Sequence, residues 1–437
     1  MLKLFEPAVN YVKELYHGLV DGWDYFWFRP VNPTTLAFIR ISTGLLVFYI
    51  HATTMGELPN LIGPHAWVDS QAISELRSIR NEFEDPMLRM AHTWYGESIW
   101  FYVQDPQVML VLQSIFLIAT ACFTLGLCSR LTSVIVWAGH LSYIQRGYVT
   151  WFGMDSVLCM LLLYLMFGPT GATLSLDRLI ERYRIARQRL GAGLALSKED
   201  LALKPRWSAN VVLRMIQIHM CIIYLFAGVS KLQGDKWWSG SAAWYTMMVP
   251  ELEIFSMRWL GTAPDWIYML IVFGITYYTL VFEISFIFLV WNRLLRPIML
   301  FGAFALHAGI GLFMGLGSFG VAMLTGCSAF INPDGLAWVI ACFFKGPGGW
   351  SFAYDRHDLA SVRAASWIAA ADPYQQVKLT TAADRPGVLA APDGRTLTGM
   401  EALWQLARIL RCFVVVSPAA FLSFVIQRKE DLQRVGS

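Results

Sequence analysis

Long runs of apolar residues constrain this chain more than any other feature of its sequence. A helix needs about 20 mostly apolar residues to cross the hydrocarbon core of a bilayer. About eight runs meet this need, near 34–54, 107–127, 131–149, 152–169, 211–230, 266–290, 297–314 and 317–332. The last two are short and joined by Gly315-Leu316-Gly317, so they are either two spans or one kinked or re-entrant element. Only 15% of the 437 residues are charged, against about 25% in soluble domains. The sequence therefore predicts an all-α polytopic membrane bundle with about eight transmembrane helices.

Basic residues orient this bundle. The connection 170–210 and the short turn 292–296 are rich in arginine and lysine, and such loops stay on the cytoplasmic side. Alternation from these points places both termini in the cytoplasm and the loops 56–106 and 231–265 outside. Residues 1–28 are amphipathic and aromatic, which predicts a helix on the membrane surface rather than a signal peptide.

The outer loop 56–106 is acidic and aromatic. Its tryptophans and tyrosine form either an interfacial aromatic belt or the lip of a substrate cleft. The acidic residues are Glu57, Asp69, Glu75, Glu82, Glu84, Asp85, Glu97 and Asp105, and the aromatic ones are Trp67, Trp94, Trp100 and Tyr102.

A second domain begins near residue 350, where the composition becomes that of a soluble protein. The expected elements are a strand at 351–355, a helix at 358–373, a strand at 377–381, a hairpin turning at Asp393-Gly394, an amphipathic helix at 400–410 and a final helix within 413–432. The order β-α-β-β-α predicts a small α/β thioredoxin-like domain. We therefore expect a membrane domain at 1–345 and a cytoplasmic domain at 350–437.

This second domain resembles the DCC family of thiol-disulfide oxidoreductases. The resemblance rests on Tyr354-Asp355 followed by a helix, and on a later Gly-x-x-Leu-Thr-Gly element. The family carries a Tyr-Asp-x-x-Cys-x-x-Cys motif, and here Asp358 and Ser361 stand at the two cysteine positions. No thiolate can form there, so the resemblance implies a redox-inactive copy kept for docking. The alternative is an unrelated α/β tail.

Ionisable residues inside predicted spans are candidates for function, because charge is costly in a bilayer. They are Arg40, His51, His140, Arg146, Asp155, Arg214, His219, Lys231, Glu283 and His307. Arg40 either snorkels to the inner headgroups or pairs with an acid inside the bundle, and Arg214 is expected to snorkel. Each of the histidines at 51, 140 and 219 is a weak candidate by itself.

Two further sets of these residues suggest pairs. Arg146 and Asp155 flank a short outer turn and form either a structural pair or part of a polar site. Glu283 and His307 lie deep in neighbouring spans, where a Glu–His or Glu–Arg pair would offset the cost of burial.

Lys231 ends an apolar segment at the predicted outer boundary and is followed by a Trp/Gly-rich turn. A lysine that a hydrophobic pocket desolvates can act as a general base near neutral pH. A lysine that points to water is an anchor. The sequence leaves both roles open.

A set of short motifs resembles the HTTM domain family, which includes the vitamin K-dependent gamma-carboxylases. In chain order the motifs are Arg40-Ile41-Ser42-Thr43-Gly44, Gly63-Pro64, Gly153-Met154-Asp155, Pro169-Thr170-Gly171 with Leu174–Asp177, the segment Ile223–Leu232 with Trp238-Ser239-Gly240, then Glu283 and His307. The resemblance covers roughly residues 20–340 and depends on the combination of motifs.

The resemblance implies a chemistry. In the carboxylases a lysine of this segment deprotonates reduced vitamin K, which reacts with oxygen to give an epoxide and a strong base. That base removes a glutamate γ-proton, and carbon dioxide adds. Lys231 and His307 would be the catalytic residues, and a reduced quinone would be the cofactor. The substrate pocket or polar network would comprise Arg40, Arg146, Asp155, Tyr224, Trp238 and Glu283.

Two departures argue against peptide glutamate carboxylation. The carboxylases carry a second histidine in an Asn-His-Ser segment, and the corresponding residues 152–156 contain none. Their large lumenal β-rich region is replaced here by the small tail. The resemblance therefore implies that the quinol chemistry is kept, while it leaves peptide carboxylation in doubt.

Two kinds of function remain open. The first is a membrane enzyme that uses Lys231 as a base on a quinol or another lipophilic substrate at the outer face. The second is a non-catalytic membrane partner, or a maturation or immunity factor for an exported peptide. A transporter is disfavoured because the sequence has no internal repeat and no paired broken helices.

No motif for a metal or a nucleotide is present, and a net charge of +3 does not favour nucleic acid. The expected partners are the lipid bilayer and an exported peptide or membrane protein. The expected location is a bacterial inner (plasma) membrane.

Overall fold

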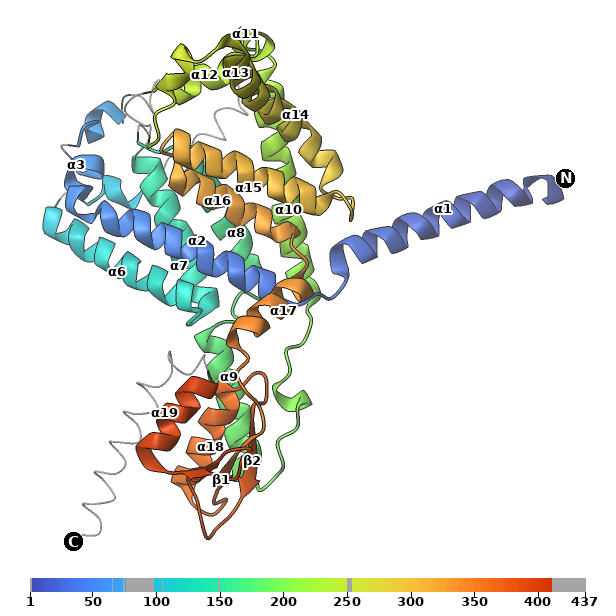
Figure 1. Ribbon diagram of the computed structural model, residues 1–437, viewed down its shortest axis with the longest axis vertical. Helices are drawn as coiled ribbons and strands as arrows, with labels where there is room; N and C mark the ends of the chain where they lie inside the picture. The colour runs from blue at the N-terminus through green and yellow to red at the C-terminus, as the bar shows by residue number, and fades with distance from the viewer. Residues whose placement is uncertain are drawn as a thin grey trace. The chain divides into compact units, whose positions relative to one another are not determined.

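The computed structural model describes residues 2–64, 66–73, 75, 98–103, 105–147, 150–249 and 254–410, with side chains from residue 10 onward (Figure 1). Most of the acidic outer loop, including Glu82, Glu84, Asp85, Trp94 and Glu97, lies outside the described residues, as does the helix expected within 413–432. The chain forms two compact units. We call Met1–Gly171 with Pro205–Asn332 the membrane unit, and Ala172–Lys204 with Pro333–Ser437 the α/β unit.

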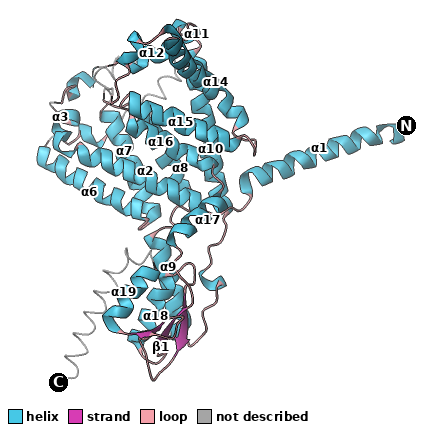
Figure 2. Cartoon of the chain, viewed as in Figure 1, coloured by secondary structure: helices cyan, strands magenta, loops and turns pink. Residues whose placement is uncertain are grey.

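The described part of the membrane unit is helical (Figure 2). Its helices are α1 (Leu2–Phe28), α2 (Thr34–Thr53), α3 (Leu58–Ile62), α6 (Pro106–Leu125), α7 (Ser129–Arg146), α8 (Gly153–Phe167), α10 (Trp207–Lys231), α11 (Asp235–Trp238), α12 (Ala242–Met247), α13 (Asp265–Tyr268), α14 (Gly274–Leu289), α15 (Arg296–Phe313) and α16 (Gly317–Cys327). A π-helical segment, Met269–Phe273, joins α13 to α14. Single 3-10 turns lie at Met55–Glu57, Ile99–Phe101, Arg258–Thr262 and Ser328–Phe330.

Five helices of the described chain are long and apolar enough to cross a membrane: α2, α6, α10, α13 continued by α14, and α15. They coincide with five of the eight expected spans. A sixth is reached if Gly317–Phe330 and α17 (Pro333–Phe344) count together as one broken span. The helix α8 has only 15 residues, and α7 carries many polar side chains, so neither meets the same test. The structure thus supports an integral membrane protein with five or six candidate spans, and it does not confirm eight.

Small residues let these helices approach closely, as is common between helices in membranes. A Cβ atom on Gly44 of α2 would collide with Thr124 Oγ1 of α6. A Cβ atom on Gly139 of α7 would collide with the ring of Phe116, also on α6. The packing of α2, α6 and α7 therefore depends on glycine at both contacts.

The C-terminal end of α1 is fixed to α10. The amide nitrogen of Asn210 donates to the carbonyl oxygens of Phe26 and Trp27, at 2.6 and 2.9 Å. Arg214 was expected only to snorkel, but its Nε donates to the carbonyl of Phe26 and its guanidinium lies 4.3 Å from the centre of the Phe26 ring. These bonds satisfy carbonyls that a helix end leaves without a partner.

The α/β unit contains a four-stranded mixed sheet in the order β2-β1-β3-β4. The strands are β1 (Trp350–Tyr354), β2 (Val377–Thr381), β3 (Leu389–Ala390) and β4 (Thr396–Leu397). β1 runs parallel to β2 and antiparallel to β3, and β3 and β4 form the expected hairpin, with Gly394 at a φ of +85° in its turn. The helices α18 (Leu359–Ala371) and α19 (Gly399–Ile409) also lie where the sequence predicts helices.

One face of this sheet is apolar. Trp350, Phe352 and Tyr354 alternate with less buried residues along β1, and Leu389 of β3 joins the same core. This alternation is the period of a half-buried strand, which explains why the sequence predicted the strand correctly.

The helix α9 (Leu176–Gly191) packs against α18 within the α/β unit. The rings of Tyr183 and Trp367 stack with their centres 4.4 Å apart. Arg182 is buried and donates to the carbonyls of Ala369, Asp372 and Leu201, at 2.8, 2.9 and 3.3 Å. The basic connection 170–210 was used above only to predict the orientation of the bundle. In the structure it also contributes α9, whose Arg182 caps the C-terminal end of α18.

Replacing Arg182 by methionine is expected to destabilise the α/β unit by about 2–4 kcal/mol, because several buried carbonyls lose their donor. Hydrogen exchange of the full-length protein in detergent would detect faster exchange at the C-terminal end of α18. Arg187→Met on the same helix is the matched control, because Arg187 is exposed. Equal exchange in both variants would mean that Arg182 does not hold this helix end.

A lysine–glutamate pair as the candidate functional site

One face of α10 carries two residues that the sequence singled out, Tyr224 and Lys231, together with Gln217, which it did not. Gln217, Tyr224 and Lys231 follow one another at seven-residue intervals, so they lie on one side of the helix. Gln217 donates to the carbonyl of Ala329 at 2.7 Å. Further along, this face packs against α14, the helix that carries Glu283.

Lys231 forms an ion pair with Glu283. Its Nζ lies 2.7 Å from Oε2 and 3.0 Å from Oε1, and it also donates to the carbonyl of Ala227 at 3.3 Å. The lysine side chain is 23% exposed and the glutamate side chain 9%. The pair is therefore shielded on the glutamate side and accessible on the lysine side.

A glycine brings the two helices close enough for this pair. A Cβ atom on Gly228 would lie 2.7 Å from Ile284 Cγ1 and 3.2 Å from Glu283 Cβ. Gly228 precedes Lys231 by three residues, so the close approach lies one turn from the lysine. The Ala-Gly-Val-Ser-Lys segment thus combines a helix contact with a charged residue at its end.

Trp237, not Trp238, contacts the lysine. Nζ of Lys231 lies 5.3 Å from the centre of the Trp237 ring, within the range of a cation–π interaction. The indole N–H of Trp238 donates to the carbonyl of Leu232 at 2.7 Å, and its ring is exposed. The hydroxyl of Tyr277 donates to the Trp238 carbonyl at 2.8 Å. Trp238 thus shapes the turn after α10, and its expected place in a substrate pocket or polar network stays a prediction.

His307 bonds to Tyr224 rather than to Glu283. The Tyr224 hydroxyl lies 2.7 Å from His307 Nε2 and 3.3 Å from Cys327 Sγ, and all three residues are buried. The Glu–His and Glu–Arg pairs expected from the sequence are thus replaced by Glu283–Lys231 and His307–Tyr224. Cys327 is a third member of this buried cluster, which the sequence did not predict because a lone cysteine in an apolar run gives no such signal.

Aromatic packing separates the two pairs. The ring of Tyr224 lies against Phe282 and Phe286, with ring centres 5.7 and 4.3 Å apart. Within the described residues no hydrogen bond joins Lys231 to His307. The two predicted catalytic residues thus have separate partners: Lys231 of α10 bonds to Glu283 of α14, and His307 of α15 bonds to Tyr224 of α10.

Arg40 pairs with a backbone carbonyl at the far end of the unit. It is fully buried and donates to the carbonyl of Thr170, so it does not snorkel.

Arg146 and Asp155 do not pair with each other. Arg146 donates to the carbonyls of Gly63 and Val68 and to Ser70 Oγ, and thereby fixes the turn after α3. The carboxylate of Asp155 accepts from the backbone N–H of Phe152 at 3.0 Å and caps α8. The acid thus bonds to the N-terminus of α8, and the terminal nitrogens of the arginine bond to backbone carbonyls, while its buried Nε has no hydrogen-bond partner among the described residues.

Two histidines that were weak candidates separately are bonded to each other. His51 Nε2 lies 3.1 Å from His140 Nδ1, and His140 Nε2 lies 3.3 Å from the carbonyl of Asp155. A carbonyl only accepts, so His140 Nε2 carries a proton and its Nδ1 accepts from His51 Nε2–H. Gln113 donates to the carbonyl of His51 at 2.9 Å. The residues lie 89 apart in the chain, and nothing local in the sequence signals this pairing.

In the α/β unit, Asp358 and Ser361, which the resemblance compares with two cysteines, both form hydrogen bonds at the start of α18. Asp358 accepts from the backbone N–H groups of Ala360 and Ser361, at 3.2 and 2.9 Å. Ser361 Oγ accepts from the backbone N–H of Asp355 at 2.8 Å. These oxygens stabilise the helix start, where the family motif would place thiols.

The described residues contain no group of three or more histidine, cysteine, aspartate or glutamate side chains that could hold a metal ion. Comparison with known proteins found no matching family model, no matching curated protein and no matching solved structure.

Proposed function

We propose that this chain is an integral membrane enzyme of the HTTM type that removes a proton from a hydroxyl group of a lipophilic substrate. The observation that carries the proposal is the ion pair of Lys231 with Glu283, which is buried on the glutamate side and accessible on the lysine side. Following the resemblance to the carboxylases, the proposed substrate class is a reduced quinone that enters from the outer leaflet. Peptide glutamate carboxylation is not part of the proposal.

Glu283 supplies what Lys231 needs to act as a base. A lysine ammonium has no free electron pair and must first lose a proton. The carboxylate 2.7 Å away accepts that proton, which leaves a neutral amine and a neutral acid. In surroundings of low polarity this neutral pair is less unfavourable than in water, because burial penalises both charges. The amine then takes the proton of the substrate hydroxyl, and the new ammonium stabilises the resulting anion.

Aromatic residues around the pair suit a planar apolar substrate. The Trp237 ring lies beside the lysine, and Phe273 and Tyr277 of the preceding π-segment and α14 pack around the turn at Gly240. Such rings favour stacking and exclude water from a proton-transfer site.

Contacts between motif residues support the HTTM resemblance. Arg40 of the first motif bonds to Thr170 of the Pro-Thr-Gly motif, and Lys231 pairs with Glu283. Arg146, a candidate site residue outside these motifs, bonds to the carbonyl of Gly63, the first residue of the Gly-Pro motif. Segments identified separately in the sequence are thus joined in space.

The strand order supports the second half of the proposal, that the α/β unit is a redox-inactive thioredoxin-like domain of the DCC type. The chain forms a parallel β1-α18-β2 unit, then the β3–β4 hairpin and α19, which is the expected β-α-β-β-α order with one strand more. We also propose that the protein lies in a bacterial inner membrane with both termini in the cytoplasm, as the basic connections indicate.

The test is the conversion of reduced vitamin K or menaquinol to its epoxide by purified protein in the presence of oxygen. Lys231→Ala should lower the rate on the order of a hundredfold or more, since a positioned base typically contributes this much. Lys231→Arg should be equally inactive, because arginine keeps the charge but does not become neutral. Lys236→Ala is the matched control, since Lys236 is an exposed lysine of the following turn.

Two results would contradict the proposal. The first is full activity in Lys231→Ala. The second is the absence of epoxide from well-folded wild-type protein.

The second candidate function, a non-catalytic membrane partner or a maturation factor for an exported peptide, is favoured by a different reading of the same ion pair. An ion pair across α10 and α14 also links two helices without chemistry. In that case Lys231→Ala would weaken the fold. Export or maturation of the partner would then fall only as far as the amount of folded protein falls. Comparing activity with the amount of folded protein in each variant separates the two functions.

A further inference from the structure

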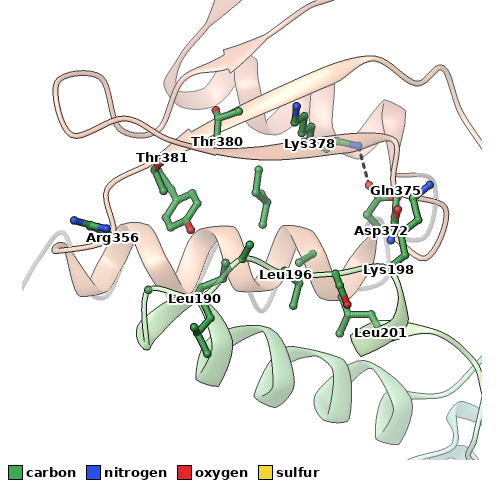
Figure 3. Close-up of a pocket in the computed structure, with 18 residues that line it drawn as sticks. Leu190, Leu196, Lys198, Leu201, Arg356, Asp372, Gln375, Lys378, Thr380 and Thr381 are labelled. Atoms are coloured by element: carbon green, nitrogen blue, oxygen red, sulfur yellow. Dashed lines mark hydrogen bonds between the residues drawn. The ribbon is translucent and has the colours of Figure 1, made fainter.

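The α/β unit carries a groove of about 910 Å³. Its floor is formed by leucines from α9 and the segment that follows, Leu190, Leu196 and Leu201 (Figure 3). All five residues of β2, Val377–Thr381, line its other side. The groove therefore runs along the full length of one strand.

β2 is an edge strand, and its outer backbone groups face the groove side. Trp350 N donates to the carbonyl of Gln376, and Ala382 N donates to the carbonyl of Tyr354. In a parallel ladder alternate residues bond to the neighbouring strand, so the even-numbered residues of β2 face β1 and the odd-numbered ones face outward. The N–H of Val377 is taken by the Asp372 carboxylate at 2.8 Å. Leu379 and Thr381 are left to present N–H and C=O groups at the open edge.

The side chains of β2 divide by chemistry between the two faces of the sheet. Val377 and Leu379 lie on the same face of the sheet as Phe352. They pack in the same apolar clusters as the leucines of the groove. Lys378 and Thr380 point to the opposite side of the strand, away from Leu190 and Leu201 (Figure 3). A strand added to this edge would therefore place alternate side chains over the leucines and beside Lys378.

The charged residues of the groove are mostly basic. Lys198, Arg356 and Lys378 are exposed at its rim. The acid that lines it, Asp372, is 3% exposed and bonded to the backbone of Val377. The charge that an occupant meets is thus positive.

We propose that β2 binds an extended peptide in which acidic and aliphatic residues alternate, by addition of the peptide as a further strand. Main-chain bonds to Leu379 and Thr381 supply affinity, as in other cases of strand addition. Aliphatic side chains enter the leucine-lined floor, and the acidic ones lie opposite Lys378. This interaction is independent of the chemistry at Lys231.

The test uses full-length protein in detergent and a fluorescent peptide in which glutamate alternates with valine or leucine. Anisotropy should show saturable binding, and a peptide of the same composition with its glutamates grouped at one end should bind about tenfold more weakly. Thr381→Pro removes an outward N–H without touching the bonds to β1, so it should lower affinity about tenfold while leaving the fold intact. Lys378→Glu should lower it similarly and should instead favour a peptide with lysine in place of glutamate. Arg187→Glu, a charge reversal on an exposed face of α9 outside the groove, is the matched control and should bind as wild type does.

Several results would overturn the proposal. They are equal binding of alternating and grouped peptides, unchanged binding by both Thr381→Pro and Lys378→Glu, and no binding by a wild-type protein that melts normally. Two more are competition by phosphatidylglycerol vesicles in place of peptide, which would make the groove a lipid-binding surface, and a dimer that Thr381→Pro dissociates, which would make the occupant a second copy.

Discussion

Replacing Glu283 by leucine is expected to lower the free energy of unfolding by about 2–3 kcal/mol. The change leaves the ammonium of Lys231 without its carboxylate in a position that is only 23% exposed, and an unpaired charge is costly there. Replacing both residues, Lys231→Met with Glu283→Leu, should recover most of the lost stability, because no charge remains to be paired. Unfolding by SDS titration in detergent micelles would measure all four members of this cycle.

The same cycle separates structure from chemistry. The double variant should be folded yet inactive in quinol turnover, since it has neither base nor proton acceptor. Glu181→Leu is the control, because Glu181 belongs to a surface pair with Arg178 and is 50% exposed, so its loss should cost less than about 0.5 kcal/mol. A Glu283→Leu variant as stable as wild type would show that Lys231 is solvated in the folded protein, and an active double variant would assign the chemistry to other residues.

Replacing Gly320 by alanine is expected to destabilise the protein by about 1–3 kcal/mol. The new Cβ atom would lie 2.8 Å from the backbone oxygen of His307, and backbone cannot move aside as a flexible side chain does. α15 and α16 would have to separate. Because His307 lies at this contact, the 2.7 Å bond between His307 and Tyr224 should weaken as well.

The matched control lies one helix away, on α15. A Cβ atom on Gly309 meets nothing closer than Phe313 at 4.0 Å, so Gly309→Ala should be neutral or stabilising by up to about 1 kcal/mol. Thermal melts in the same detergent compare the two alanine variants directly. Equal melting temperatures would mean that α15 and α16 lie further apart than the structure has them.

The sequence predicted elements wherever a local period decides the structure. The alternation in β1, the turn at Asp393-Gly394 and the five long apolar helices depend on residues within one element, and the structure contains all of them. In the span expected at 317–332, the α-helix α16 ends at Cys327 and a 3-10 turn follows. Hydropathy did not predict this helix end, because the apolar run continues past it.

The sequence predicted which buried polar residues are candidates better than it predicted which residues they bond to. Glu283 and Lys231 were both recognised as candidates, but their pairing depends on the helix contact at Gly228, 55 residues before Glu283 in the chain (283 − 228). Arg146 and Asp155 flank one turn and were expected to form either a structural pair or part of a polar site, yet each bonds to backbone groups and not to the other. Backbone donors and acceptors compete for every buried charge, and a sequence does not display them.

The two-part origin of the α/β unit imposes an order on biosynthesis. The ribosome completes α9 before residues 205–332 exist, whereas α18, on which α9 packs, emerges only afterwards. Until then the apolar side of α9 has no cover, while the intervening helices are being inserted into the bilayer. A nascent chain released after residue 332 would keep the five described apolar helices that reach span length, but its α9 would lack the helix α18 on which it packs. Such a product would therefore expose the face of α9 that packs on α18 in the complete chain, although its apolar helices are intact.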